Sequence, residues 1–217
     1  MYRTKNEMIY SELKKTIING TLSPGEKLII SNISKQYGMS DIPVREALTR
    51  LEAEGLVFSK PHSGYHVSPM TEEEIIKIFE IRTVLESYCT RVAVPHIPES
   101  TLRELEEMVQ NEEERFIELQ DSEGYRNHNF QFHRKVYEHC GNDILLNLIN
   151  QLWENTKRYP SQFGDIDHMR KSHEEHIGLV QAIKNRDSLL AEQLEQKHKQ
   201  GAIQAIVKVV RKTVTSD

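Results

Sequence analysis

The sequence is poor in cysteine and has no long apolar run, and each shortage narrows the class of protein. Only Cys89 and Cys140 are cysteines among 217 residues. The N-terminus lacks the apolar core of a secretion signal, so two cysteines favour free thiols in a reducing cytoplasm over a disulfide framework. No apolar run approaches the ~20 residues that a membrane-spanning helix needs. We therefore expect a cytoplasmic protein with no membrane partner.

An excess of positive charge is also missing, although the charges are unevenly distributed. The formal net charge is −5. Residues 1–69 hold 9 Lys and Arg against 7 Asp and Glu, whereas the remainder holds 19 against 26. A slightly basic head on an acidic body is typical of a nucleic-acid-binding module joined to a domain that does not bind nucleic acid. With so small an excess, DNA affinity would need well-placed cations and two copies of the head.

The segment 40–57 is the most informative part of the head. Ser40 is typical of a helix N-cap, Pro43 of a first turn and Gly55 of a helix end. Spacing of i, i+3, i+4 and i+7 predicts one buried stripe, made of Val44, Ala47, Leu48 and Leu51. Arg45 and Thr49 lie off this stripe. Such a helix has the form of a recognition helix for the DNA major groove, and equally that of an ordinary amphipathic helix.

The neighbouring segments favour DNA binding. We predict helices at 5–19 and 32–37, with Ser31 as the cap of the second and Gly38 as its end. Residues 56–59 and 65–67 read as two short strands joined by a turn at 60–64. Two helices with a tight turn between them, followed by a hairpin, predict a winged helix-turn-helix.

From residue 70 onward the pattern is helical throughout. Thr71 and Glu74 fit a capping box, and Asp187 is typical of an N-cap. The run Glu112–Glu114 is expected to lie on a solvated helix face. The predicted helices are 72–94, 99–119, 122–140, 142–159, 166–185 and 187–214. We therefore predict a mainly α protein, with a winged helix-turn-helix at 1–69 and an antiparallel six-helix bundle for effector binding and dimerisation at 70–217.

Polar residues on apolar stripes of the bundle suggest a metal site. Asn129 and His133 lie four residues apart, His176 shares a stripe with Val180 and Ile183, and His198 shares one with apolar residues from 190 to 194. Three imidazoles and an amide on core faces suit a divalent ion such as Zn, Ni, Mn or Fe. The alternative is separate core histidines, each hydrogen-bonded locally, and the pattern alone leaves both interpretations open.

Arg82 is a second polar residue in a core stripe. A buried guanidinium needs an anion. That anion is either the carboxylate of a small ligand, held by two parallel hydrogen bonds, or the side chain of Glu86 one turn along the helix. The sequence does not separate these alternatives.

Several motifs together resemble a known family. Residues 22–28, 43–48, 51–57 and 64–67 resemble the winged-helix head of GntR-family bacterial transcriptional regulators. Ile81-Arg82, Phe132-His133 and Glu175-His176 resemble the FCD ligand-binding domain of the FadR-type subfamily. The resemblance implies a homodimeric, ligand-responsive regulator, most often a repressor. It also implies the metal ligands Asn129, His133, His176 and His198.

Two positions depart from the pattern of that family. Asn129 stands where the family usually has Asp, which removes a negative charge from the metal site. Asp41 stands where the head usually has Arg, so a different operator is expected. The resemblance further implies that Arg45 reads a guanine edge of a pseudo-palindromic operator.

The remaining expectations concern DNA contacts, the effector and two alternative functions. Residues expected at phosphates, at the wing's groove or beside Arg45 are Ser31, Ser40, Thr49, Arg50, Lys60, His62 and Gly64. The expected effector is a small carboxylate bound by Arg82 and the metal. One alternative is a sensor whose effector is the metal itself. A metal-dependent hydrolase is the other, and it lacks an obvious general base, so we expect no enzymatic activity.

Overall fold

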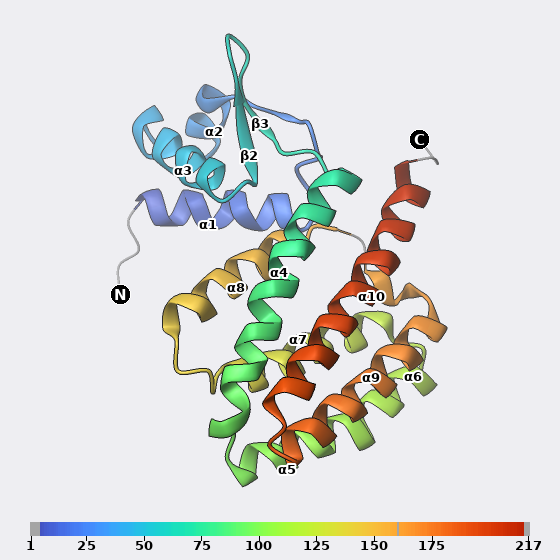
Figure 1. Cartoon of the computed structure of the whole chain (residues 1–217). Helices are drawn as coiled ribbons and strands as arrows, with labels where there is room; N and C mark the ends of the chain where they lie inside the picture. The colour runs from blue at the N-terminus through green and yellow to red at the C-terminus, as the bar shows by residue number, and fades with distance from the viewer. Residues whose placement is uncertain (1–4, 160, 215–217) are drawn as a thin grey trace. The chain divides into compact units, whose positions relative to one another are not determined.

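The computed structural model describes residues 5–159 and 161–214, with side chains up to Arg211 (Figure 1). The chain divides into two compact units. The first contains the residues up to Thr71 together with Gln151–Arg158, and the second contains Glu72–Asn150 and the residues from Tyr159 onward. None of the described helices is long and apolar enough to cross a membrane.

The first unit is a winged helix-turn-helix. Its elements are α1 (Lys5–Ile18), β1 (Lys27–Leu28), α2 (Ile30–Gln36), α3 (Asp41–Ala53), β2 (Val57–Lys60) and β3 (Gly64–Val67). The strands form an antiparallel sheet in the order β1-β3-β2, and β2 and β3 form the wing hairpin of Figure 1. Strand β1 was not predicted. Its two residues are too few to show an alternating pattern.

One face of helix α3 is buried, and the predicted apolar stripe forms that face. Val44, Ala47, Leu48 and Leu51 are all 0% exposed. Gly55, with φ of +75°, ends the helix, and the Leu56 N–H donates to the Leu51 carbonyl at 3.0 Å. This 6→1 bond is that of a Schellman motif, in which glycine adopts the left-handed conformation without steric cost.

Of the two predicted serine caps, Ser40 lies at the predicted position and Ser31 does not. Helix α2 begins at Ile30, earlier than expected, with Ile29 at the N-cap, so Ser31 lies inside the first turn. Ser40 does occupy the N-cap of α3, but its side chain makes no capping hydrogen bond. Ile30 packs against the core of the first unit and begins the helix ahead of Ser31, because packing outweighs the preference for a polar cap.

The segment Gln151–Arg158 completes the first unit. Asn155 Nδ2 donates to the Glu54 carbonyl at 2.7 Å, and Arg158 Nη1 donates to the Ser68 carbonyl at 2.9 Å. The predicted division at residue 69 assigned this segment to the C-terminal domain. Contacts this far apart in the sequence leave no local pattern, so the hydrophobic periodicity could not reveal them.

The second unit is a bundle of helices. Its elements are α4 (Glu72–Ala93), η1 (Val94–His96), α5 (Glu99–Glu107), η2 (Met108–Glu113), α6 (Glu114–Glu118), α7 (Ser122–Tyr137), the first part of α8 (Asp143–Thr156), η3 (Gln162–Gly164), α9 (Ile166–Lys184) and α10 (Ser188–Val214). Helices α4 and α10 run side by side, and α9 packs against α10 (Figure 1). The N-cap prediction for Asp187 is confirmed, since its Oδ1 accepts from the Leu190 N–H at 3.0 Å.

One predicted helix, 99–119, is interrupted by a π-helical segment, η2. The wider turn of a π-helix changes the direction of the side chains that follow. Glu113, at the end of η2, is 0% exposed, whereas Glu112 and Glu114 are exposed. The prediction that all three glutamates lie on a solvated face was therefore wrong for Glu113.

Candidate functional site

The exposed face of α3 carries two of the predicted DNA contacts. Arg45 and Thr49 are exposed and lie one turn apart. Thr49 Oγ1 lies 3.4 Å from the Tyr65 hydroxyl of β3, which ties the helix face to the wing. The two predicted serine contacts, Ser31 and Ser40, are also exposed. So are the predicted contacts on the wing, which are Lys60, His62 and Gly64.

Arg50 has an intramolecular environment that the sequence did not predict. Its guanidinium carbon lies 3.7 Å from the centroid of the Tyr10 ring, and its Nε is 3.5 Å from Glu54 Oε1. Lys14 and the Tyr10 hydroxyl also bond to Glu54, at 2.8 and 2.6 Å. This cluster packs α3 against α1, so the structure supports a structural role for Arg50.

Asp41 also has a structural partner. The Ser34 hydroxyl of α2 donates to Asp41 Oδ1 at 2.6 Å, which joins the two helices of the helix-turn-helix at the start of α3. A carboxylate in the first turn additionally interacts favourably with the helix dipole. These contacts explain an acidic residue where the related family usually has arginine.

The wing ends in a tight turn with unusual backbone conformations. The Ser63 N–H donates to the Lys60 carbonyl at 3.0 Å, and His62 has φ of +61°. Pro61 followed by a residue with positive φ is the pattern of a type II turn, which usually carries glycine or asparagine at that position. The left-handed conformation costs His62 roughly 1–2 kcal/mol. It leaves the imidazole exposed at the tip of the hairpin.

Three histidines meet in the core of the second unit, as the sequence predicted. His133 Nε2 on α7 lies 3.2 Å from His198 Nε2 on α10 and 3.3 Å from His176 Nε2 on α9. The three side chains are buried, and their nitrogens lie within 4.8 Å of one another. Two nitrogen ligands of a tetrahedral zinc ion, each at 2.0–2.1 Å from it, are separated by about 3.3–3.4 Å. The spacing of the histidines therefore suits a metal ion.

Carboxylates face the outer nitrogens of all three rings. Nδ1 of His176 lies 2.6 Å from an oxygen of Glu113, Nδ1 of His198 lies 2.8 Å from Glu175, and Nδ1 of His133 lies 3.3 Å from Glu195. For His176 and His198 the contact is a hydrogen bond, which fixes the tautomer with the proton on Nδ1 and leaves the Nε2 lone pair for a metal. The apolar stripes of the sequence predicted the histidines of this cluster but none of these carboxylates.

The electrostatics of the cluster also favour a cation. Burial, reinforced by Lys199, holds the pKa of His133 well below its usual value, and burial with the nearby His176 does the same for His198. Neutral imidazole is the form that binds metal. With protons on Nδ1, the Nε2 lone pairs face one another at close range and repel, and a cation between them turns this repulsion into attraction.

Asn129 lies on the same face of α7, one turn before His133. It is 4% exposed, and its Oδ1 has no hydrogen-bond partner among the residues that the structure describes. The hydroxyls of Tyr125 and Ser172, one turn before Asn129 and His176 respectively, are buried and equally lack such a bond within the described chain. Buried polar atoms without partners cost about 1–3 kcal/mol each, so a metal, water or ligand is expected to satisfy them.

Arg82 forms the internal ion pair. Its Nε donates to Glu86 Oε1 at 2.6 Å, and both side chains are buried. The other oxygen of Glu86 lies 2.9 Å from Lys199 Nζ and 2.9 Å from the Tyr137 hydroxyl. Tyr137 and Lys199 also contact Glu195, at 2.6 and 3.2 Å. A continuous network therefore joins Arg82 to the carboxylate that faces His133.

Three further histidines of the bundle, His128, His168 and His173, lie in two other places. His173 Nδ1 lies 3.0 Å from Glu113 Oε2, and His128 Nε2 lies 3.6 Å from Glu113 Oε1, so both surround the carboxylate that also binds His176. His168 lines a separate groove. None of the three joins the His133–His176–His198 cluster as a candidate ligand.

Comparison with known proteins identifies the family. Residues 77–201 match the model of the FCD domain, and residues 5–67 match that of bacterial regulatory proteins of the gntR family. The chain belongs to the GntR family. Its combination of a GntR head with an FCD domain fits the FadR-type subfamily, which confirms the predicted resemblance. Members of the family are transcriptional regulators and not enzymes.

Individual relatives agree with this assignment. The chain is 28% identical to the HTH-type transcriptional repressor GlaR of Escherichia coli over 204 residues, covering 87% of this chain and 90% of GlaR. It is 31% identical to the uncharacterised regulator YdhC of Bacillus subtilis, a match that covers 66% of this chain and 64% of YdhC. The structure of E. coli McbR/YncC superimposes with a TM-score of 0.72 at 26% identity, covering 96% of this chain and all of that one.

Proposed function

We propose that this protein is a ligand-responsive DNA-binding repressor that acts as a homodimer in the bacterial cytoplasm. Its head would bind operator DNA, and its FCD domain would hold a divalent metal and a small carboxylate effector. The observation that carries the effector part is the convergence of His133, His176 and His198, with a carboxylate behind each ring.

In this proposal the three histidines and Asn129 hold the metal. Asn129 supplies an oxygen donor whose partner is otherwise missing in the described chain. The fully buried charges nearby comprise Glu86, Glu113 and Glu195 against Arg82 and Lys199, an excess of negative charge that a divalent cation offsets. When bound, Zn, Ni, Mn or Fe offers coordination positions to carboxylate oxygens. Metal analysis of the purified proteins tests the assignment. We expect a bound divalent metal in the wild type and its loss in His133→Ala.

Arg82 is proposed to attract the effector's carboxylate. It lies in the network that reaches Glu195 and therefore the metal site. The substitution Arg82→Lys keeps the positive charge beside Glu86 but removes the planar fork of donors. We expect this variant to bind metal normally and to respond more weakly to any carboxylate that releases the wild type from DNA. An unchanged response would assign Arg82 to the internal ion pair alone.

The homodimer is supported by an apolar face on α4. Ile81, Val84 and Tyr88, at i, i+3 and i+7, are 54%, 67% and 50% exposed. Ile81 and Val84 also line a shallow apolar groove. Exposed apolar stripes of this kind mark protein interfaces. Val84→Glu should convert dimers to monomers in analytical ultracentrifugation, whereas Leu119→Glu, at a similarly exposed leucine on another surface, should not. A Val84→Glu dimer of unchanged stability would exclude this face.

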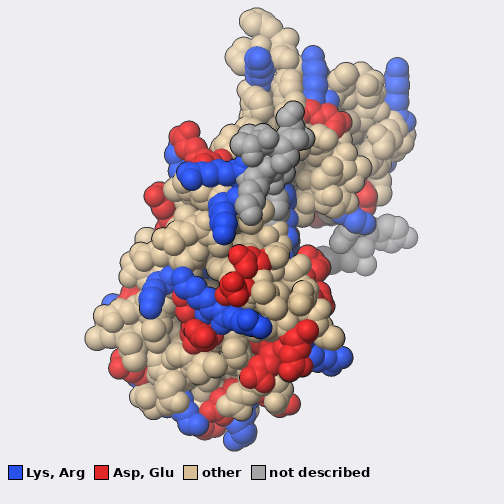
Figure 2. Space-filling model, turned by 90° about the vertical axis from the view of Figure 1, so that its right-hand side faces the viewer, with Lys and Arg blue, Asp and Glu red and all other residues tan. Residues whose placement is uncertain are grey.

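DNA recognition is proposed to depend on a few Lys and Arg side chains at specific positions of the head, Arg45 among them. Residues 1–69 hold 9 Lys and Arg against 7 Asp and Glu, which is only a small excess of positive charge. On the face that Figure 2 draws, Lys and Arg side chains are interspersed with Asp and Glu. Arg45→Ala should therefore cost roughly 1–3 kcal/mol in binding to the protein's own promoter. Arg103→Ala removes the same charge from an exposed position on α5 and serves as the control. Equal affinity of the wild type for the promoter and for random DNA of equal length and salt would refute the proposal.

A titration of metal into the protein–DNA complex separates the effector hypothesis from the metal sensor. In the proposed mechanism, metal alone leaves operator affinity nearly unchanged, and release requires a carboxylate as well. The effector shifts the DNA-binding equilibrium only by its differential affinity for the two states. Release of DNA by metal without an organic ligand would favour the sensor.

A further inference from the structure

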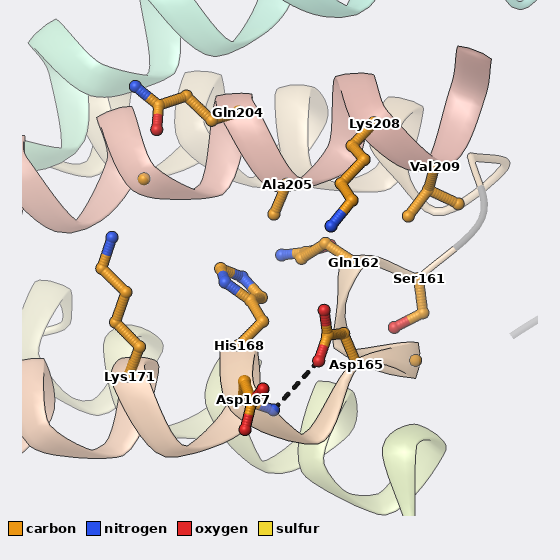
Figure 3. A pocket seen from close by; sticks show the side chains of 12 residues that line it. Ser161, Gln162, Asp165, Asp167, His168, Lys171, Gln204, Ala205, Lys208 and Val209 are labelled. Atoms are coloured by element: carbon orange, nitrogen blue, oxygen red, sulfur yellow. Dashed lines mark hydrogen bonds between the residues drawn. The ribbon is translucent and has the colours of Figure 1, made fainter. Parts of the chain in front are cut away.

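A groove separate from the histidine cluster lies between α9 and α10, closed at one end by η3 (Figure 3). Its volume is about 550 Å³, within the range of small-molecule sites. The floor on α10 includes Gly201 and Ala205, whose small size leaves the space open. All of its lining residues belong to the second unit.

Two lysines reach into this groove from opposite walls. In Figure 3, Lys171 of α9 and Lys208 of α10 extend toward each other's helix, and the imidazole of His168 stands between them. Lys208 has no ion-pair partner within the described part of the chain, and the ion pair of Lys171 is a long one, 4.0 Å to Glu175. Among the residues that the structure describes, neither ammonium group makes an ion pair shorter than 4.0 Å, so both remain able to pair with a bound anion.

The other polar groups of the groove suit a hydroxylated ligand. Gln162 points toward its centre, and Ser161 lies at its end. Asp165 and Asp167 also line it. One oxygen of Asp165 accepts the Asp167 N–H at 3.0 Å as a helix cap. Amide, hydroxyl and carboxylate groups provide hydrogen-bond donors and acceptors for the hydroxyls of a ligand. The negative charges of the two aspartates disfavour a ligand that is anionic along the whole groove.

We propose that this groove binds a small organic phosphate ester, with the phosphate between Lys171 and Lys208 and its hydroxylated part toward η3. Lysine binds phosphate as a point charge, whereas recognition of a planar carboxylate favours the fork of arginine. The Nε2 or Nδ1 of His168 provides a third donor beside the phosphate. Burial, followed by Lys171, lowers the pKa of His168, so a neutral ring is expected to donate a single hydrogen bond.

The groove lies close to the histidine cluster, and its test must separate the two sites. Glu175 links the two sites, because it lies 4.0 Å from Lys171 Nζ and also accepts a hydrogen bond from His198 Nδ1. A phosphate can also bind a protein-held metal. The titrations therefore use full-length, metal-free protein, and His133→Ala is included because it removes the proposed metal site and leaves the groove intact.

The experiment is isothermal titration calorimetry with glucose 6-phosphate, glucose, inorganic phosphate and citrate. We expect glucose 6-phosphate to bind the metal-free wild type and His133→Ala alike, and glucose not to bind. Lys171→Ala and Lys208→Ala should each weaken binding by about fivefold or more, the loss of one charge-assisted bond. Lys197→Ala, which removes a charge from α10 outside the groove, should leave it unchanged.

Three results would overturn the proposal. The first is no heat of binding for either phosphate compound at millimolar concentration. The second is equal affinity of the wild type and the Lys171→Ala/Lys208→Ala double variant. The third is tighter binding of citrate than of both phosphate compounds, which would replace the phosphate ester by a polycarboxylate.

Discussion

Replacing Glu113 by glutamine tests whether the carboxylates behind the histidines set the affinity for metal. Glu113 is fully buried, and its two oxygens lie 2.6 Å from His176 Nδ1 and 3.0 Å from His173 Nδ1. Glutamine keeps the size and one oxygen acceptor but removes the negative charge. The loss of such an outer partner typically weakens metal binding by about 10- to 100-fold. That factor corresponds to about 1.4–2.7 kcal/mol.

The same change can be expressed as a thermal shift. Zinc at 100 times the wild-type Kd stabilises the protein by about 2.7 kcal/mol. For a chain of this size, the Tm rises by about 5–11 °C. At the same zinc concentration a variant that binds 10- to 100-fold more weakly retains about 0.4–1.4 kcal/mol. Its Tm should therefore rise by only about 1–6 °C.

The assay combines zinc competition against a chelating dye with thermal unfolding of metal-free and zinc-loaded protein. Circular dichroism of the metal-free variants checks that each is folded. Glu114→Gln makes the same change at the exposed neighbouring residue and should bind zinc as the wild type does. Likewise His96→Ala, at an exposed histidine, should leave zinc affinity intact, whereas His133→Ala should abolish tight binding. Equal zinc affinities of wild type, Glu113→Gln and Glu114→Gln would refute the role assigned to the buried carboxylate.

Three further predictions concern stability. Arg82→Ala should destabilise the second unit by about 3–5 kcal/mol in urea denaturation, because it breaks a buried ion pair and leaves Glu86 undercompensated. Burial raises the pKa of Glu54, but its hydrogen bond with Lys14 helps to bring it below the usual value. The resulting stabilisation is complete above the unfolded-state pKa and is lost as the pH falls through the folded-state pKa, so Glu54→Gln should flatten the acid side of the stability profile. His62→Gly should relieve backbone strain and raise stability by up to about 1 kcal/mol, with weaker DNA binding if the imidazole contacts DNA.

The parts of the fold that depend on local periodicity were predictable from the sequence. The stripe of α3, the end of that helix at Gly55 and the cap at Asp187 follow from side-chain spacing and capping chemistry, and the structure confirms each. The convergence of three histidines was predictable too, because each lies on an apolar stripe and only a shared core brings such stripes together. By contrast, Leu190, which was expected to share the buried stripe of His198, is 41% exposed.

The carboxylates of the site were not predictable from the same pattern, with one exception. Glu113 is turned inward by the π-helical segment before it, and no residue in Met108–Glu113 signals that widening in advance. Glu175 faces His198 on a neighbouring helix, a contact set by tertiary packing. Glu195 is the exception, since it lies on one buried stripe of α10 with Ala191, His198 and Ala202. A glutamate three residues before a buried histidine on that stripe was a readable signal.

The buried network has a consequence for how an effector would act. Arg82 on α4, Tyr137 on α7 and Glu195 on α10 are joined through Glu86, and Glu195 faces the ring of His133. Buried charges are costly unless paired. An effector carboxylate that competes for Arg82 therefore obliges Glu86 to rely on its remaining partners, and a metal that draws on His133 changes the field at Glu195. The two ligands would thus act on one set of charges. Arg82 is on α4, and α4 is the next element in the chain after the wing strand β3. We therefore expect an effector to act on the DNA-binding head by shifting α4.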